Sequence, residues 1–141
     1  MIAVDTNVLV YAHREEFPQH RKARARLTEL AEGSAPWAIP IFCLGEFLRV
    51  VTHPRVLAPA FTAAEACDAL GRVLASPSVQ VLVPGARFWS LLVEAIFGAD
   101  ARGNLVFDAQ VVALCQEAGV TMLPTEDRDF ARFASFPARR L

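Results

Sequence analysis

Short apolar segments alternate with longer segments of helical character along the whole sequence. The apolar segments cover residues 2–4, 37–39, 79–83 and 120–124, and a short run at 139–141 suits a last edge strand. The segments between them have helical patterns and cover residues 6–13, 18–32, 41–51, 62–75, 86–97, 104–118 and 126–133. This alternation predicts an α/β fold, with a mostly parallel sheet of about five strands and helices on both of its faces.

The boundaries of these segments carry local signals. Thr62 and Glu65 are spaced as in a capping box, which predicts that a helix begins there. Gly119 follows the helical segment 104–118 and suits a helix end, and residues 98–103 are expected to form a loop. The sequence shows no internal repeat and no linker, and 141 residues suit one domain with a substantial core. We therefore expect residues 1–141 to form a single domain.

The composition of the sequence constrains the cellular environment expected for this domain. The sequence is 54% hydrophobic, yet none of its apolar runs approaches the roughly 18 to 20 residues that cross a bilayer. The first residues show no signal-peptide pattern. Cys43, Cys67 and Cys115 are widely spaced among apolar neighbours, which predicts reduced, buried thiols. We expect a cytoplasmic protein without a membrane segment, whose surplus apolar residues fill a core and a subunit or partner surface.

Two acidic residues are placed at the ends of predicted strands. Asp5 directly follows the strand predicted at 2–4, and Asp127 follows the strand predicted at 120–124. Ligands of open parallel sheets bind outside the carboxyl ends of the strands. Asp5 and Asp127 are therefore expected at the same edge of the sheet, although they come from opposite ends of the chain.

Two further acids lie within apolar helical segments. Glu46 has Phe42, Cys43 and Val50 as neighbours one helical turn away. Asp108 has Leu105, Val111 and Val112 one helical turn away and Cys115 two turns away. We expect both side chains to point towards the protein interior, where an unpaired carboxylate is costly.

The four acids suggest a divalent metal ion. If four carboxylates converge at separations near 6 Å, their mutual repulsion is on the order of 15 kcal/mol at an effective dielectric constant of 20. That repulsion rivals the stability of a small domain. A divalent cation relieves it, and ligation by oxygen alone favours Mg²⁺ or Mn²⁺ over zinc. Such a centre can activate water for attack on a phosphodiester.

Each acid also has a structural interpretation. Asp5 and Asp127 can cap the helices that follow them, Glu46 can pair with Arg49 or Arg55, and Asp108 can pair with an arginine distant in sequence. All four structural interpretations must hold at once to remove the metal site, so the metal site is favoured.

Arginine residues provide weaker candidates for substrate contact. Arg87 and Arg102 flank segments near the expected cleft and are weak candidates for binding phosphate. The basic run at 20–26 fits a solvated helix face or a contact with RNA or a protein partner.

The chain resembles a PIN domain and, more narrowly, the VapC toxins of toxin–antitoxin pairs. The resemblance spans nearly the whole chain and rests on four motifs in order: Asp5-Thr6-Asn7, Glu46 in an apolar helix, Asn104-x-x-x-Asp108-Ala109, and Thr125-x-Asp127-x-Asp129-Phe130. It implies a three-layer α/β/α fold, Mg²⁺-dependent cleavage of RNA, a homodimer, and inhibition by a cognate VapB-type antitoxin.

The resemblance also implies roles for single residues. It assigns catalytic and metal-binding roles to Asp5, Glu46, Asp108 and Asp127. It assigns supporting roles to four polar residues, Asn7, Asn104, Thr125 and Asp129. Asp127 and Asp129 compete for the fourth acidic position, and Asp127 is favoured.

Two other functions deserve comparison with a nuclease. Phosphoryl-transfer domains of the receiver or haloacid-dehalogenase type also place an Asp at a strand end, but they use a lysine at a later strand end. The only lysine here, Lys22, lies in an early helical segment, which argues against that chemistry. A PIN-like module that binds RNA or protein without cleavage is the second alternative, and the presence of all four acids argues against it.

Overall fold

Five short parallel strands lie at the centre of the molecule in a computed structural model that describes residues 1–141. Strands β1 (Ile2–Ala3), β2 (Trp37–Pro40) and β3 (Val79–Leu82) form one sheet, and β4 (Leu123–Thr125) pairs with β5 (Ala138–Arg140). A parallel bridge between Ile2 and Met122 joins the two parts. The strands therefore follow one another across the molecule in the order β3-β2-β1-β4-β5, and the predicted α/β fold with a parallel sheet is confirmed.

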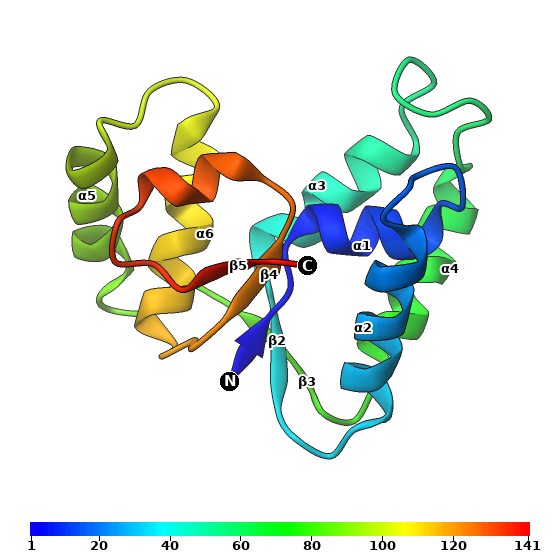
Figure 1. The fold of residues 1–141 in the computed structure, drawn as a ribbon, viewed down its shortest axis with the longest axis horizontal. Helices are drawn as coiled ribbons and strands as arrows, with labels where there is room; N and C mark the ends of the chain where they lie inside the picture. The colour runs from blue at the N-terminus through cyan, green and yellow to red at the C-terminus, as the bar shows by residue number, and fades with distance from the viewer.

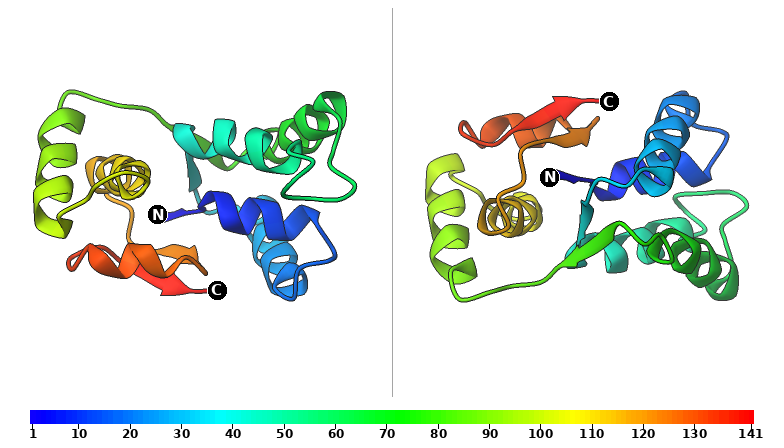
Figure 2. Two further views of the ribbon diagram at one scale, coloured as in Figure 1. Left: turned by 90° about the horizontal axis from the view of Figure 1, so that it is seen from above. Right: turned by 90° about the horizontal axis from the view of Figure 1, so that it is seen from below.

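Helices cover both sides of these strands (Figure 1). One layer contains α5 (Phe88–Ala99) and α6 (Leu105–Glu117). The other contains α1 (Thr6–His13), α2 (His20–Glu32), α3 (Ile41–Val51) and α4 (Ala63–Leu74). The views from above and below show the same three layers and place the C-terminal end of β5 beside α2 (Figure 2).

Burial on both faces explains why the strands read as continuous apolar runs. Val4, Trp37, Ala38 and Ile39 are fully buried between the helical layers. The strands are short because each needs only a few residues to cross this core. None of the helices has the length and apolar content needed to span a membrane.

Most predicted elements are present, with differences at their boundaries. The strand predicted at 120–124 is β4 at Leu123–Thr125, and the helix predicted from residue 18 begins at His20. Thr62 and Glu65 form the predicted capping box at the start of α4. Helix α5 continues to Ala99, into the predicted loop, and Asp100 ends it in the left-handed conformation with a φ of 47°. The helix predicted at 126–133 is a shorter 3₁₀ helix, η1 (Arg128–Arg132).

The cysteine prediction holds for two residues of three. Cys43 and Cys115 are buried free thiols, whereas Cys67 is exposed on α4. The prediction for Cys67 was wrong because its apolar neighbours in sequence occupy the inner face of an amphipathic helix, while Cys67 lies on the outer face.

Candidate metal site

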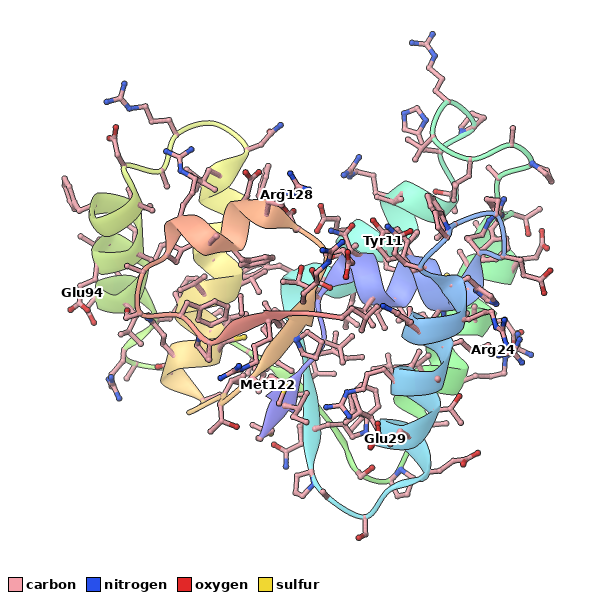
Figure 3. The ribbon with its side chains drawn as sticks, in the orientation of Figure 1. Tyr11, Arg24, Glu29, Glu94, Met122 and Arg128 are labelled. Carbon is pink, nitrogen blue, oxygen red and sulfur yellow. The ribbon has the colours of Figure 1, made fainter.

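The parallel pairing of the central strands gathers acidic residues at one edge of the molecule. Asp5 follows β1 and Asp127 follows β4, and the bridge between Ile2 and Met122 makes these two segments neighbours. Asp108 lies in the first turn of α6, and Glu46 lies in the middle of α3. Figure 3 shows oxygen-bearing side chains gathered near the labelled Tyr11 and Arg128, in the upper centre of the molecule.

Asp5 is held rigidly in a buried position. It is the N-cap of α1, and its Oδ1 accepts a hydrogen bond of 3.1 Å from the backbone N–H of Val8. Its Oδ2 accepts a hydrogen bond of 2.5 Å from the Thr125 hydroxyl. Burial raises the pKa of Asp5 to about 7, although both hydrogen bonds act in the opposite direction. The capping role and the site role of Asp5 are therefore compatible.

Thr125 connects two of the acidic residues. Besides donating to Asp5, its hydroxyl oxygen accepts a hydrogen bond of 3.0 Å from the backbone N–H of Asp127. Asp127 in turn caps η1, because its Oδ1 accepts a hydrogen bond of 2.9 Å from the N–H of Asp129. The end of β4 thus fixes the positions of both acids relative to Asp5.

Asp108 has no partner within the protein. Its side chain is half-buried and makes neither a hydrogen bond nor an ion pair, which matches the predicted shortage of basic neighbours. Burial, together with the charges of Asp127, Asp129, Glu46 and Asp5, raises the pKa of Asp108 to about 7. The first turn of a helix favours a negative charge, so burial and the neighbouring acids together outweigh that effect on the pKa of Asp108.

Glu46 does not point into the interior, contrary to the prediction. Its side chain is 46% exposed at the rim of the acidic site. Its Oε2 accepts a hydrogen bond of 2.7 Å from the Thr6 hydroxyl, and its Oε1 lies 3.7 Å from Arg49. An exposed ion pair at that distance contributes little to stability. The expected pairing with Arg49 thus exists without removing Glu46 from the site.

Three carboxylates form the tightest group. Asp108, Asp127 and Asp129 each offer an oxygen, and these oxygens lie within 4.8 Å of one another. Asp129 therefore accompanies Asp127 in the cluster. The donors are all carboxylate oxygens, without histidine or cysteine, and such a set suits Mg²⁺ or Mn²⁺. An unpaired Asp108 beside two further acids is the arrangement that a divalent cation would stabilise.

The remaining predicted residues lie in α1 and near the two ends of α6. Asn104 is exposed immediately before α6 and makes no capping hydrogen bond, and Asn7 is half-buried in α1. Arg102 precedes Asn104 and pairs with Asp100 at 3.2 Å. Arg87 lies elsewhere, because its backbone N–H donates to Glu117 in the last turn of α6. Nine residues of helix place Glu117 about 13 Å from Asp108, so the backbone of Arg87 lies at the end of α6 away from the acidic cluster.

A cavity beside the acids has no clear signal in the sequence. It has a volume of about 490 Å³, and its lining includes Thr125 and Asp127 on one side and Tyr11 and Gln19 on another. Its residues come from α1, the segment before α2, and the chain beyond β4. Only the folded chain brings these segments together, so the sequence analysis missed the cavity and both Tyr11 and Gln19.

Comparisons with known proteins agree with this architecture. The family model of the PIN domain matches residues 2–135. Ribonuclease VapC43 of Mycobacterium tuberculosis is 39% identical over 133 residues, covering 94% of this chain and 90% of that protein. Ribonuclease VapC31 of the same organism is 36% identical over 137 residues, covering 96% and 94%.

Solved structures share the fold. The crystal structure of VapC20 of Mycobacterium tuberculosis, a toxin that cleaves the sarcin-ricin loop, matches with a TM-score of 0.73 at 23% identity and covers 100% of both chains. The structure of VapBC2 from Rickettsia felis, bound to a DNA fragment from its promoter, matches with a TM-score of 0.73 at 18% identity, covering 99% of this chain and 98% of that one.

Proposed function

Because this chain belongs to the PIN domain family, among the VapC ribonucleases, we propose that it is a Mg²⁺-dependent endoribonuclease and the toxin of a VapB–VapC pair. Mn²⁺ is the alternative ion, since the same oxygen ligands suit it. Asp5, Glu46, Asp108 and Asp127 are the proposed catalytic and metal-binding residues. The chain is proposed to act as a single domain in the cytoplasm.

The observation that carries this proposal is the unpaired Asp108. Its oxygen lies within 4.8 Å of oxygens of Asp127 and Asp129, and none of the three carboxylates makes an ion pair. Such a group is unstable when fully ionised, and a divalent cation stabilises it. Asp127 is the proposed fourth ligand because Thr125 fixes its backbone, and Asp129, which is exposed, takes a supporting role.

The proposed residues differ in burial, and each proposed role suits the burial of its residue. Asp5 is held by Thr125 and by the N–H of Val8, so its carboxylate orients the site without moving. Glu46 is the most exposed of the four acids, and it is open to solvent and able to accept a proton from water. Thr6 keeps Glu46 in place through its hydroxyl. A bound Mg²⁺ would polarise the scissile phosphate and favour ionisation of the attacking water.

Exposed apolar side chains support the proposal that this chain binds protein partners. Trp89 and Phe97 on α5 are 72% and 82% exposed, and Phe107 on α6 is 63% exposed. Large exposed aromatic residues of this kind mark interaction surfaces. We assign them to contacts within a homodimer and with a VapB-type antitoxin; the matched structures include complexes named VapBC.

Cleavage of RNA by the purified chain tests the proposal. The wild-type protein is expected to cleave RNA in Mg²⁺ and to stop when EDTA is added. Asp108→Asn and Asp5→Asn should each lower the cleavage rate by about 1,000-fold or more, since stabilisation of the transition-state charge is worth several kcal/mol. Asp68→Asn is the matched control, because Asp68 is exposed on α4 and pairs with Arg72.

Two results would count against this assignment. Cleavage that survives in both Asp108→Asn and Asp5→Asn would remove these residues from the catalytic site. RNA binding by the wild-type protein without cleavage in Mg²⁺ or Mn²⁺ would favour the alternative of a non-catalytic PIN-like binding module.

A further inference from the structure

We infer that the cavity beside the acidic site binds one unpaired nucleotide of the RNA strand, next to the phosphodiester that is cleaved, and that Gln19 contacts its base. This inference rests on the proposed function and adds a determinant of sequence preference to it. The cavity shares Thr125 and Asp127 with the acidic site, so a nucleotide within it lies directly beside the proposed point of cleavage.

The size and lining of the cavity suit a nucleoside. Its volume of about 490 Å³ falls in the range of roughly 300 to 1,000 Å³ of small-molecule sites. Half of its 14 lining residues are hydrophobic, and the buried Phe130 and Phe136, whose rings lie 6.0 Å apart, form part of its apolar floor, while the half-buried Tyr11 is the aromatic ring open to a base. Unpaired bases of RNA stack on aromatic rings, whereas bases in a duplex are not available for such contact.

The charges at the cavity favour a nucleic acid. Its lining contains Arg128, Arg139 and Arg140, against the acids Glu126 and Asp127. Arg140 pairs with Glu126 at 3.3 Å, but Arg128 and Arg139 make no ion pair. Two unpaired guanidinium groups beside an apolar floor provide contacts for a phosphate that flanks a buried base.

Gln19 offers an amide that the protein leaves unused. It occupies the N-cap position of α2 but makes no capping hydrogen bond. Its Oε1 is buried and has no hydrogen-bond partner. Exchanging the amide oxygen and nitrogen would only put an unpaired donor in the same place. A buried polar atom without a partner is costly, and an amide that turns towards a base edge removes that cost.

Tyr11 forms the wall between Gln19 and the acids. Tyr11 lines the same cavity as Thr125 and Asp127, and burial raises the pKa of its phenol, with the charges of Asp5, Glu126 and Asp127 acting in the same direction. Tyr11 of α1 and Arg128 at the start of η1 both line this cavity. A base that enters the cavity therefore passes the Tyr11 ring, which is available for stacking.

Limited digestion of an RNA pool of random sequence, followed by sequencing of the new ends, tests this inference. The wild-type protein should show its strongest base preference at one nucleotide adjacent to the cleaved bond. Gln19→Ala should reduce that preference by about 10-fold or more and leave preferences at other positions unchanged. Gln80→Ala is the matched control, since Gln80 is exposed on β3.

The second measurement uses the wild-type protein alone. An RNA with an abasic nucleotide at the preferred position should be cleaved at least 10-fold more slowly than the same RNA with the preferred base there. Equal cleavage of the two RNAs, or an unchanged preference in Gln19→Ala, would overturn the inference. Gln19→Ala with wild-type preference but weaker binding of a VapB antitoxin would also overturn it and assign the cavity to the protein partner.

These outcomes differ from a failure of the proposed function. Wild-type protein that cleaves no RNA in Mg²⁺ or Mn²⁺ contradicts the nuclease itself. Wild-type protein that cleaves RNA with no base preference beside the cleaved bond contradicts only the nucleotide subsite.

Discussion

The two ends of helix α6 each hold a half-buried acidic side chain, and their surroundings differ. Asp108 in the first turn has no hydrogen bond and no ion pair, and other acids lie close to it. Glu117 in the last turn accepts hydrogen bonds from the backbone N–H groups of Gly85 at 2.8 Å and Arg87 at 2.7 Å. Glu117 therefore fixes the segment that leads into α5, and its partners belong to the protein itself.

The difference separates a structural carboxylate from one available to a ligand. The end of α6 that carries Glu117 is the unfavourable end for a negative charge, yet two donors satisfy that carboxylate. The end that carries Asp108 is the favourable one, yet burial and neighbouring acids raise the pKa of Asp108 to about 7. Asp108 and Glu117 are both half-buried, but donors of the protein satisfy only Glu117. The position of an acidic residue on a helix therefore does not by itself identify it as functional.

The largest expected effect concerns the pH dependence of stability without metal. Burial raises the pKa of Asp5 from 3.8 to about 7, so the folded protein binds a proton that the unfolded chain has released. Stability from this proton is present at low pH and is lost as pH rises through 7. In EDTA, we expect the free energy of unfolding to fall by about 3 kcal/mol between pH 5 and pH 8 from Asp5, with a smaller contribution from Asp108.

Urea denaturation of matched variants isolates this effect. His13 acts in the opposite direction, because burial lowers its pKa and stability gained from the neutral ring increases with pH. The decisive quantity is therefore the difference in pH slope between the wild type and Asp5→Asn. Glu117→Gln should keep the wild-type slope. Equal slopes in Asp5→Asn and the wild type would mean that Asp5 does not titrate in this range.

The second effect concerns stabilisation by Mg²⁺. At pH 8 and a Mg²⁺ concentration 100 times its Kd, the wild type should gain about 2.7 kcal/mol of stability. Asp108→Ala should lose most of this gain, while its stability in EDTA equals or exceeds that of the wild type, because the substitution relieves repulsion among the acids. Glu117→Ala should retain the gain. A marked destabilisation of Asp108→Ala in EDTA would show that Asp108 is a structural partner instead.

The sequence was informative where local chemistry decides the structure. The capping box of Thr62 and Glu65 and the strand ends at Asp5 and Asp127 depend on a few adjacent residues and on parallel pairing. The isolation of Asp108 also followed from the sequence, since it has no basic residue within one helical turn. These features locate the acidic edge without any knowledge of long-range packing.

The sequence was less informative where packing at a distance decides. Glu46 was expected to point inwards because of its apolar helical neighbours, but Phe42 is itself exposed and Val50 is half-buried, so they do not define a buried face. Glu117 binds backbone groups about 30 residues earlier in the chain, and no local pattern indicates such a contact. The same contact places the backbone of Arg87 at the end of α6 away from Asp108, which sequence proximity to a predicted strand end could not reveal.

The third effect concerns the structural end of α6. Glu117→Ala removes the acceptor for two backbone N–H groups and should lower the free energy of unfolding by about 1 to 2 kcal/mol. RNA cleavage should remain at the wild-type level, since Glu117 lies at the opposite end of the helix from Asp108. Urea denaturation measures the change, with Glu94→Ala as the control because Glu94 is exposed on α5 and makes no ion pair. If Glu117→Ala lost RNA cleavage but kept wild-type stability, Glu117 would have the functional role that is assigned here to Asp108.

The smallest effect tests the contact between Gly85 and Glu117 directly. A Cβ added at Gly85 would lie 2.7 Å from Oε1 of Glu117, so Gly85→Ala must displace that carboxylate and weaken its hydrogen bonds. The substitution also restricts the unfolded chain, which stabilises a protein by about 0.4 to 1 kcal/mol where the native backbone accepts alanine. The two effects oppose each other, and Gly85→Ala alone should change stability by less than about 0.5 kcal/mol.

A double-mutant cycle separates these opposing effects. In the Glu117→Ala background the displaced carboxylate is absent, so Gly85→Ala should stabilise the protein by about 0.5 to 1 kcal/mol. The coupling between the two positions is then of similar size and is measurable by urea denaturation. Additive changes would show that the Glu117 carboxylate does not hold the Gly85 backbone in solution. In that case, Glu117 would keep only the N–H of Arg87 as a partner, and the contrast between the two ends of α6 would be smaller.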